Sequence, residues 1–139
     1  MPFIGLGYKK LDEISKDENT KAVIAVDLYG NMPDYDSIVK LCDEYNLLLI
    51  EDAAEAHGAE FKSKRVGSFG DIACFSFFGN KIITTGEGGI CVTNSNELNE
   101  RMRLLRDHGM SKDKKYWHEE VGYNYRMTNF KASIDCAQL

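Results

Sequence analysis

One lysine, Lys81, stands where a buried segment is expected to meet a loop. The apolar run from Ile72 to Phe78 ends three residues before it, and a glycine-rich turn at 86–89 leads into a second apolar run, Ile90 to Val92. The pattern predicts a strand, a tight loop and another strand. Burial lowers the pKa of a lysine and leaves the free amine that Schiff-base chemistry requires. The alternative is a lysine whose stem is buried and whose ammonium group reaches water.

Four other residues are candidates for a shared site. Asp52 ends a predicted strand and Glu55 follows three residues later, Ser76 precedes Lys81 by five residues, and Asn124 lies in an aromatic-rich segment. Each also has a purely structural interpretation. The aspartate can cap a turn, the glutamate can be a solvated carboxylate, the serine can be a satisfied core hydroxyl, and the asparagine can be a turn residue.

The elements that must position these residues begin with a βαβ unit. Ala22 to Asp27 and Leu47 to Ile50 are short apolar runs typical of buried parallel strands. Between them, Asp34 is predicted to cap a helix that Asn46 ends, with apolar residues at positions 38, 41, 42 and 45. The unit is right-handed by the usual rule. Glu51 and Asp52 then stand at the carboxyl end of the second strand, where open α/β sheets bind ligands.

The remaining segments are assigned more coarsely. Phe61 to Val66 is predicted to be a polar excursion or a hairpin, and residues 107–115 a charged, mobile connector. The predicted helices are a short one at Tyr8 to Ser15, one capped by Asn94 or Ser95 with Leu98, Met102 and Leu105 on one face, and a final one capped by Thr128 that is expected to continue to Leu139.

Composition excludes several classes of function. A chain of 139 residues that is 43% hydrophobic and 28% charged is an ordinary globular sequence, and its net charge of −5 argues against nucleic-acid binding. No run is long enough to span a membrane, and the start lacks a charged signal-peptide front. The cysteines and histidines lack metal-ligand spacing, so no metal site is predicted. The four cysteines are predicted to be reduced core thiols of a cytoplasmic protein: Cys42, Cys74, Cys91 and Cys136.

From about Thr20 to Leu139 the sequence resembles the DegT/DnrJ/EryC1/StrS family of sugar aminotransferases, which are fold-type I enzymes that use pyridoxal 5'-phosphate (PLP). Several motifs carry the resemblance in the same order along the chain. They are Glu51-Asp-Ala-Ala-Glu-Ala-His-Gly-Ala59, Gly67-Ser-Phe-Gly-Asp71, Phe75-Ser-Phe-Phe-Gly-Asn-Lys81 with Thr84-Thr-Gly-Glu-Gly-Gly89, Arg106-Asp-His-Gly109, and Gly122-Tyr-Asn-Tyr-Arg-Met-Thr128.

The resemblance implies a fold and a domain. The expected class is α/β, with a mostly parallel sheet flanked by helices, as in the central part of the large domain of fold-type I transferases. Full members are much longer than 139 residues. Residues 1–139 are therefore expected to form part of the PLP-binding large domain, without the upstream phosphate-binding segment or the C-terminal small domain.

The resemblance also implies a role for each candidate residue. Lys81 is expected to form the Schiff base with PLP and to move a proton between the cofactor and the substrate carbon. Asp52 is expected to pair with the pyridine nitrogen, Glu55 to lie near the phenolic oxygen or the substrate, and Ser76 to donate to the phosphate. Asn124 is expected to reach the cofactor phosphate of a neighbouring subunit, which implies a homodimer with shared active sites.

The implied reaction moves an amino group, usually from glutamate, to a keto carbon of a nucleotide-linked deoxysugar similar to GDP-4-keto-6-deoxymannose, for surface polysaccharide or O-antigen synthesis. A lysine at position 81 favours transamination over the dehydration performed by relatives with histidine there. Two alternatives stay open. One is a truncated, non-catalytic α/β remnant. The other is a doubly wound nucleotide-binding module, which the turn at 86–89 disfavours because it lies between two predicted strands.

Overall fold

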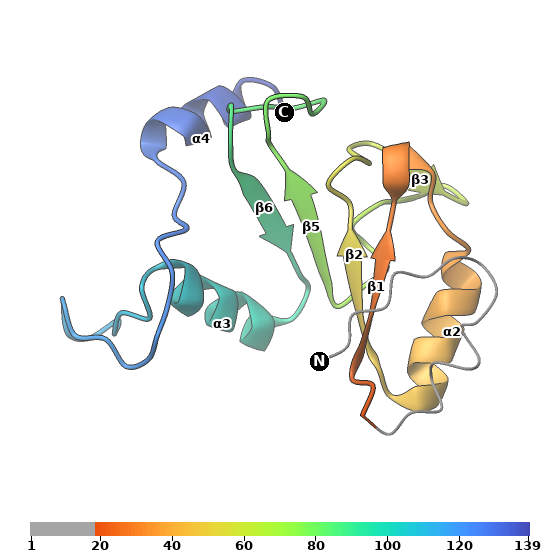
Figure 1. Ribbon diagram of the computed structural model, residues 1–139, viewed down its shortest axis with the longest axis horizontal. Coiled ribbons are helices and arrows are strands. Elements are labelled where there is room, and N and C mark those ends of the chain that lie inside the picture. The colour runs from red at the N-terminus through yellow and green to blue at the C-terminus, as the bar shows by residue number, and fades with distance from the viewer. Residues whose placement is uncertain (1–18) are drawn as a thin grey trace.

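The computed structural model describes residues 19–139, so the predicted helix at Tyr8 to Ser15 lies outside the described residues. A four-stranded sheet is at the centre (Figure 1), and three of its strands run parallel. The fourth runs antiparallel to its neighbour. This arrangement confirms the expected α/β class with a mostly parallel sheet. In spatial order the strands are β1 (Ala22–Val26), β2 (Leu48–Asp52), β5 (Ile72–Ser76) and β6 (Gly89–Val92).

The predicted βαβ unit is present between β1 and β2. After β1 the chain makes a short 3₁₀ turn, η1 (Leu28–Gly30), and then enters α2 (Tyr35–Tyr45). The helix begins where expected, because Asp34 Oδ1 accepts a hydrogen bond from the Ser37 backbone N–H at 3.4 Å. It ends at Asn46, whose left-handed backbone (φ 52°) is a common helix stop.

The two faces of the sheet are unequal. In paired strands, residues in register point to the same side, so Ala25, Glu51 and Ala73 share one face and Asp52 and Cys74 share the other. The first face packs against α2 and holds the main core, where the ring of Tyr35 stacks on another aromatic ring at 4.3 Å. The second face is more open, and it carries Asp52 at the carboxyl end of β2.

Outside this unit the chain forms a hairpin and two further helices. The segment at 61–66 proves to be the hairpin of β3 (Glu60–Phe61) and β4 (Lys64–Arg65). Ser95 caps α3 (Asn96–Arg106), and Thr128 caps α4 (Asn129–Cys136). In Figure 1 these two helices lie at opposite ends of β6. Within residues 19–139, no helix has the length and apolar character needed to cross a bilayer.

The expectation that the last helix continues to Leu139 is wrong. The helix ends at Cys136, and the backbone N–H groups of Gln138 and Leu139 both donate to the carbonyl of Asp135. A side-chain contact lies directly after the last helical turn. The amide of Gln138 accepts from the Thr84 N–H at 3.0 Å and donates to the Thr84 carbonyl at 2.8 Å. This pairing ties the end of α4 to the loop that carries Lys81.

The prediction that all four cysteines are core thiols is also wrong. Cys42 is buried in α2, but Cys74 is only half-buried, and Cys91 and Cys136 are exposed. The apolar neighbours of Cys91 in the sequence belong to β6, an edge strand whose residues are mostly exposed. Apolar sequence context therefore did not translate into burial at the edge of the sheet.

Glu51 does not point to the ligand-binding side of the sheet. Its side chain is fully buried on the α2 face and accepts three backbone hydrogen bonds, each 2.6 Å long. The donors are the N–H groups of Gly67, Phe69 and Gly70, which form the turn that leads into β5. Glu51 therefore holds this turn against β2 and has a structural role.

We predict that Glu51→Gln lowers the free energy of unfolding by about 1–3 kcal/mol. Either orientation of the amide places an NH₂ group against backbone N–H donors, so one buried donor loses its acceptor if Oε2 is replaced and two lose it if Oε1 is replaced. Urea titration followed by circular dichroism measures the change. Glu44→Gln, at an exposed position of α2, is the matched control. Equal stability of the two variants would contradict the structural role.

A second buried carboxyl group, Asp27, follows β1 directly. It is fully buried, and Oδ1 accepts a hydrogen bond from the Tyr35 hydroxyl at 2.8 Å, while Oδ2 has no partner among the described residues. Burial raises the pKa of Asp27 from 3.8 to about 6, the Tyr35 bond opposes this, and repulsion from Glu51 and Asp52 adds to it. The folded chain therefore favours the protonated form of Asp27 more than the unfolded chain does.

Because the folded state holds this proton more tightly than the unfolded state, the contribution of Asp27 to stability is full below its ordinary pKa and is lost as the pH rises through 6. We predict that Asp27→Asn, which keeps an acceptor for Tyr35, is more stable than the natural chain at pH 8, by up to about 3 kcal/mol. The gain should shrink toward pH 4. Thermal unfolding across this range tests it, with exposed Asp113→Asn as control. A gain independent of pH would refute the assignment.

Candidate active site

Lys81 lies on a tight loop between β5 and β6, as predicted. Three hydrogen bonds converge on Phe77 at the start of the loop: its N–H donates to the Gly88 carbonyl at 2.9 Å, and its carbonyl accepts from Thr84 Oγ1 at 3.0 Å and from the Thr85 N–H at 3.1 Å. The Lys81 N–H donates to the Phe78 carbonyl at 2.9 Å. The loop therefore has a defined backbone that fixes where the lysine side chain emerges.

The amine of Lys81 is held by Glu55. Lys81 Nζ lies 3.1 Å from Glu55 Oε1, and only 14% of the lysine side chain is exposed. The other oxygen, Oε2, accepts from the Tyr29 N–H at 3.2 Å. The bond from Lys81, followed by that from Tyr29, lowers the pKa of Glu55. The structure thus supports the buried interpretation of the lysine, with a carboxylate as its partner.

Tyr29 provides that N–H from a strained backbone. It has φ 54° and ψ 29° inside the 3₁₀ turn, a left-handed conformation that is uncommon for residues other than glycine. Its side chain is 86% exposed, so packing of the ring does not account for the conformation. Strain of this kind often marks functional sites. Here it directs a backbone donor at the carboxylate that holds Lys81.

Asp52 and Ser76 lie on the same face of the sheet at the carboxyl ends of neighbouring strands. Asp52 is in register with Cys74, and Ser76 follows two residues later on β5. Asp52 Oδ1 accepts from the Ala54 N–H at 3.2 Å, and Ser76 Oγ accepts from the Phe78 N–H at 3.3 Å. Both residues are half-buried. The sheet register therefore brings together two candidates that are 24 positions apart in the sequence.

Asn124 is placed differently from the other four candidates. It is exposed and forms an isolated antiparallel bridge with Asp107, directly after α3. Among the described residues, no hydrogen bond or ion pair joins it to Lys81, Glu55, Asp52 or Ser76. The expectation that it acts at the site of a neighbouring subunit stays a prediction.

His57 belongs to the candidate site, although the sequence analysis did not include it. Its ring lies 5.4 Å from the ring of Phe75 and 6.0 Å from that of Phe77, and both ring nitrogens are buried without a partner in the part of the chain described. Burial lowers the pKa of His57, and the positive charge of Lys81 lowers it further, whereas Asp135 raises it. The signal in the sequence that could have identified His57 is its position two residues after Glu55.

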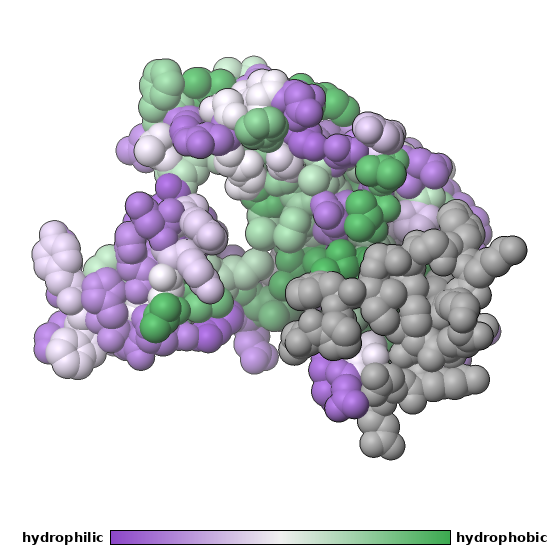
Figure 2. All heavy atoms as spheres, viewed as in Figure 1, coloured by the Kyte–Doolittle hydropathy of each residue, from purple (hydrophilic) through white to green (hydrophobic). Residues whose placement is uncertain are grey.

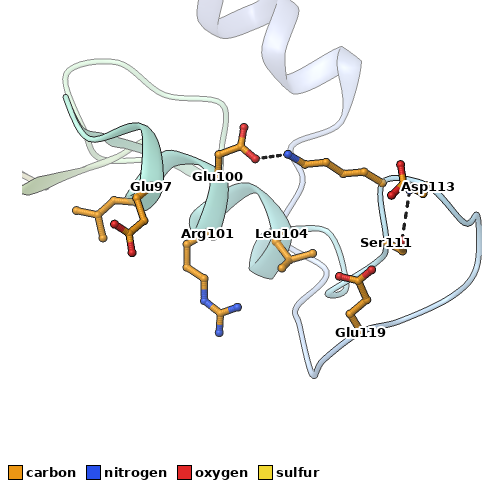
Figure 3. Close-up of a pocket in the computed structure, with 9 residues that line it drawn as sticks. Glu97, Glu100, Arg101, Leu104, Ser111, Asp113 and Glu119 are labelled. Atoms are coloured by element: carbon orange, nitrogen blue, oxygen red, sulfur yellow. Dashed lines mark hydrogen bonds and ion pairs between the residues drawn. The ribbon is translucent and has the colours of Figure 1, made fainter.

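A surface groove lies away from these residues. It has a volume of about 560 Å³ and runs along α3 beside the connector that follows this helix (Figure 3). Its lining is of mixed charge, and the ammonium of Lys112 pairs with Glu100 across it. None of the five predicted site residues lines this groove. Within residues 19–139, no three His, Cys, Asp or Glu side chains are arranged to hold a metal ion.

The model of the DegT/DnrJ/EryC1/StrS aminotransferase family matches residues 13–139. The chain belongs to this family. It is 57% identical over 120 residues to a GDP-perosamine synthase of Caulobacter vibrioides, covering 86% of this chain and 32% of the relative. The chain thus spans about a third of the length of the curated relatives it matches.

Solved structures agree with this assignment. The Helicobacter pylori aminotransferase PseC, involved in the biosynthesis of pseudoaminic acid, superimposes with a TM-score of 0.83 at 38% identity, over 88% of this chain and 33% of that protein. GDP-4-keto-6-deoxymannose-3-dehydratase (ColD), with bound GDP-perosamine, gives 0.82 at 29% identity, over 93% and 38%.

The residues present fit PLP, the cofactor of this family. Lys81 offers an amine for the cofactor aldehyde, Asp52 offers a carboxylate for a protonated ring nitrogen, and Ser76 offers a hydroxyl for the phosphate. His57 adds two buried ring nitrogens that lack partners within residues 19–139, and their pKa is influenced by the charge of Lys81.

We predict that the pKa of His57 responds to its charged neighbours. Lys81→Gln removes a positive charge and should raise this pKa, whereas Asp135→Asn should lower it further. NMR titration of the ring protons measures both shifts. Lys112→Gln, in the distant groove, is the control and should have no effect. If Lys81→Gln left the His57 titration unchanged, the ring would not lie beside the amine.

Proposed function

We propose that this chain forms the lysine-bearing part of a PLP-dependent aminotransferase acting on nucleotide-linked keto sugars, and that residues 1–139 belong to its PLP-binding large domain. The observation that carries the proposal is the Lys81–Glu55 pair at 3.1 Å, at the edge of the sheet where Asp52 and Ser76 end their strands. Family membership supports the same chemistry.

The polar side chains of the site are partly occupied and partly free. One oxygen each of Asp52 and Glu55, and the hydroxyl oxygen of Ser76, accept a backbone N–H. This leaves Asp52 Oδ2 available to hold a proton on a ring nitrogen, and it leaves the Ser76 hydroxyl hydrogen available to donate to a phosphate oxygen. The backbone bonds fix each side chain before a ligand arrives, which lowers the cost of orienting it.

Glu55 and Lys81 control the position of a mobile proton. Glu55 Oε1 accepts from Lys81 Nζ, so it is placed to receive the proton that the lysine must lose before its amine acts as a nucleophile or a base. When bound, PLP supplies the electron sink that stabilises negative charge on the substrate carbon. Lys81 Nζ would then be the group that moves a proton between that carbon and the cofactor.

The relatives support a narrower substrate proposal. GDP-perosamine synthases of three organisms are 52–57% identical to the matched part of this chain. The segments Phe77-Phe-Gly-Asn-Lys81 and Tyr116-Trp-His118 resemble that subgroup. The proposed acceptor is therefore a GDP-linked 4-keto-6-deoxymannose, the donor glutamate, and the pathway cytoplasmic synthesis of surface polysaccharide such as O-antigen.

Exposed aromatic side chains fit a role at the sugar-nucleotide entrance and at a dimer interface. Tyr123 and Tyr125 are 52% and 73% exposed, and their rings stack at 5.0 Å. Asn124 lies between them. The proposed homodimer with shared active sites would place this segment against the cofactor phosphate of the other subunit.

A second candidate is a non-catalytic remnant, which the open surface of the chain favours. Hydrophobic atoms gather at the centre of the view in Figure 2, in the region of β5 and β6. The exposed apolar side chains include Ile82, Phe78 and Ile90, which are 74%, 58% and 46% exposed. Such surface promotes association unless something covers it.

We predict that the chain, incubated with PLP and reduced with borohydride, carries a pyridoxyl group on Lys81 alone. Lys81→Ala should abolish the modification, whereas the control Lys112→Ala should keep it. Peptide mapping by mass spectrometry locates the group. Asp52→Asn should weaken PLP binding by roughly 10–100-fold, because one charge-assisted hydrogen bond is lost.

Two results would overturn this proposal. Labelling of Lys81→Ala at the same stoichiometry would remove the lysine from its assigned role. A soluble chain that ignores PLP would favour the remnant. If the cofactor binds, adding glutamate should convert its absorbance to that of the aminated form. A subsequent GDP-linked keto sugar should restore the original spectrum, whereas a UDP-linked one should not.

A further inference from the structure

Two cysteines on neighbouring strands face each other beside the candidate site. Cys74 on β5 is in register with Cys91 on β6, and their sulfur atoms are 3.6 Å apart. Both are free thiols. A disulfide bond is about 2 Å long, so the two sulfur atoms would have to approach by about 1.6 Å to form one.

The position of this pair in the antiparallel ladder favours a bond. The Phe77 N–H donates to the Gly88 carbonyl, so this pair of residues is a hydrogen-bonded pair. Opposite pairs in an antiparallel ladder alternate between hydrogen-bonded and non-hydrogen-bonded types. Counting three steps along the strands makes Cys74 and Cys91 a non-hydrogen-bonded pair, in which the two Cα atoms approach most closely.

The two thiols are chemically unequal. The hydrogen bond with Cys74 lowers the pKa of Cys91 to about 6, and the same bond, with burial, raises the pKa of Cys74. Cys91 is exposed and Cys74 is half-buried. The accessible sulfur of Cys91 therefore forms the nucleophilic thiolate more readily, and the shielded sulfur of Cys74 holds its proton more tightly.

We propose that Cys74 and Cys91 form a dithiol modification site that reacts with low-molecular-weight disulfides and closes reversibly into a cross-strand disulfide. The Cys91 thiolate attacks one sulfur of the small disulfide, forming a mixed disulfide and releasing one small thiolate. Cys74 then loses its proton and attacks Cys91 Sγ, forming the protein disulfide and releasing the second small thiol. The Cys91 thiolate and the Cys74 thiol together lose two electrons and one proton, and the small disulfide gains them and leaves as one thiolate and one thiol.

The closed bond would constrain the segment that carries the predicted chemistry. The loop between the two cysteines contains Ser76 and Lys81, and Cys74 is in register with Asp52 on β2. Joining the strands at this point restricts the opening of the β5–β6 hairpin without adding a contact at Lys81 itself. The oxidation state of the pair would thus set how freely the lysine loop moves.

Oxidised glutathione is the probe for this proposal, applied to the folded chain. Mass spectrometry should show loss of two hydrogens and a crosslink between the peptides of Cys74 and Cys91, reversed by dithiothreitol. In Cys74→Ser, Cys91 should instead retain glutathione as a stable mixed disulfide. In Cys91→Ser, no crosslink should form, and Cys74 should stay largely unmodified. In the natural chain at pH 6, Cys91 should react with oxidised glutathione roughly 10-fold faster than the thiol of an unstructured peptide does.

The other two cysteines supply internal controls. Exposed Cys136 should accumulate a mixed disulfide, and buried Cys42 should stay unmodified unless the chain unfolds. Persistence of glutathione on Cys91 in the natural chain would overturn the proposal, because Cys74 would then not resolve it. Failure of Cys91 to react while Cys136 does would overturn it equally. Circular dichroism of each variant confirms that the fold is intact.

Discussion

The buried carboxylate of Glu51 is the constraint on which the site depends. It takes three short backbone hydrogen bonds from the turn at 67–70 and holds this turn against β2. The close approach requires glycine, because a Cβ at Gly70 would lie 2.7 Å from the Leu49 carbonyl oxygen, and Gly67 has φ +85°. The next residues enter β5 directly. Together with Asp71, whose side chain accepts from the Leu49 N–H and whose N–H donates to the Leu49 carbonyl, both at 2.8 Å, this anchor sets the register that brings Asp52 and Ser76 to one face.

Strand alternation lets β2 serve two purposes with adjacent residues. Glu51 points into the core, where hydrogen bonds compensate the cost of burying a carboxylate. Asp52, one residue later, points to the open face and leaves Oδ2 free for a ligand. The hydrogen bonds at the site follow one pattern, since Asp52, Glu55 and Ser76 each accept a nearby backbone N–H. Backbone donors therefore orient the chemistry, and Tyr29 adopts a strained conformation to provide one of them.

Periodicity and capping rules were sufficient for the local elements. The βαβ unit, the caps at Asp34, Ser95 and Thr128, and the strand-loop-strand around Lys81 all depend on neighbours in the sequence, which such rules describe. The contact of Gln138 with Thr84 joins residues 54 positions apart, and the exposure of Cys91 depends on β6 lying at the edge. Which face Glu51 occupies, and the burial of His57 beside Lys81, likewise follow from long-range packing that periodicity does not encode.

Three acidic side chains lie near the carboxyl ends of β1 and β2, and the fold compensates the charge of each one differently. Asp27, Glu51 and Asp52 repel one another enough to contribute to the raised pKa of Asp27. Glu51 is compensated by backbone N–H groups, and Asp27 by the Tyr35 hydroxyl and by a raised pKa of about 6. The Asp52 side chain accepts one backbone N–H among the described residues and is half-buried beside these charges. A cation bound at Asp52 Oδ2 would relieve that repulsion. The repulsion among the three carboxyl groups therefore favours a positively charged ring at Asp52.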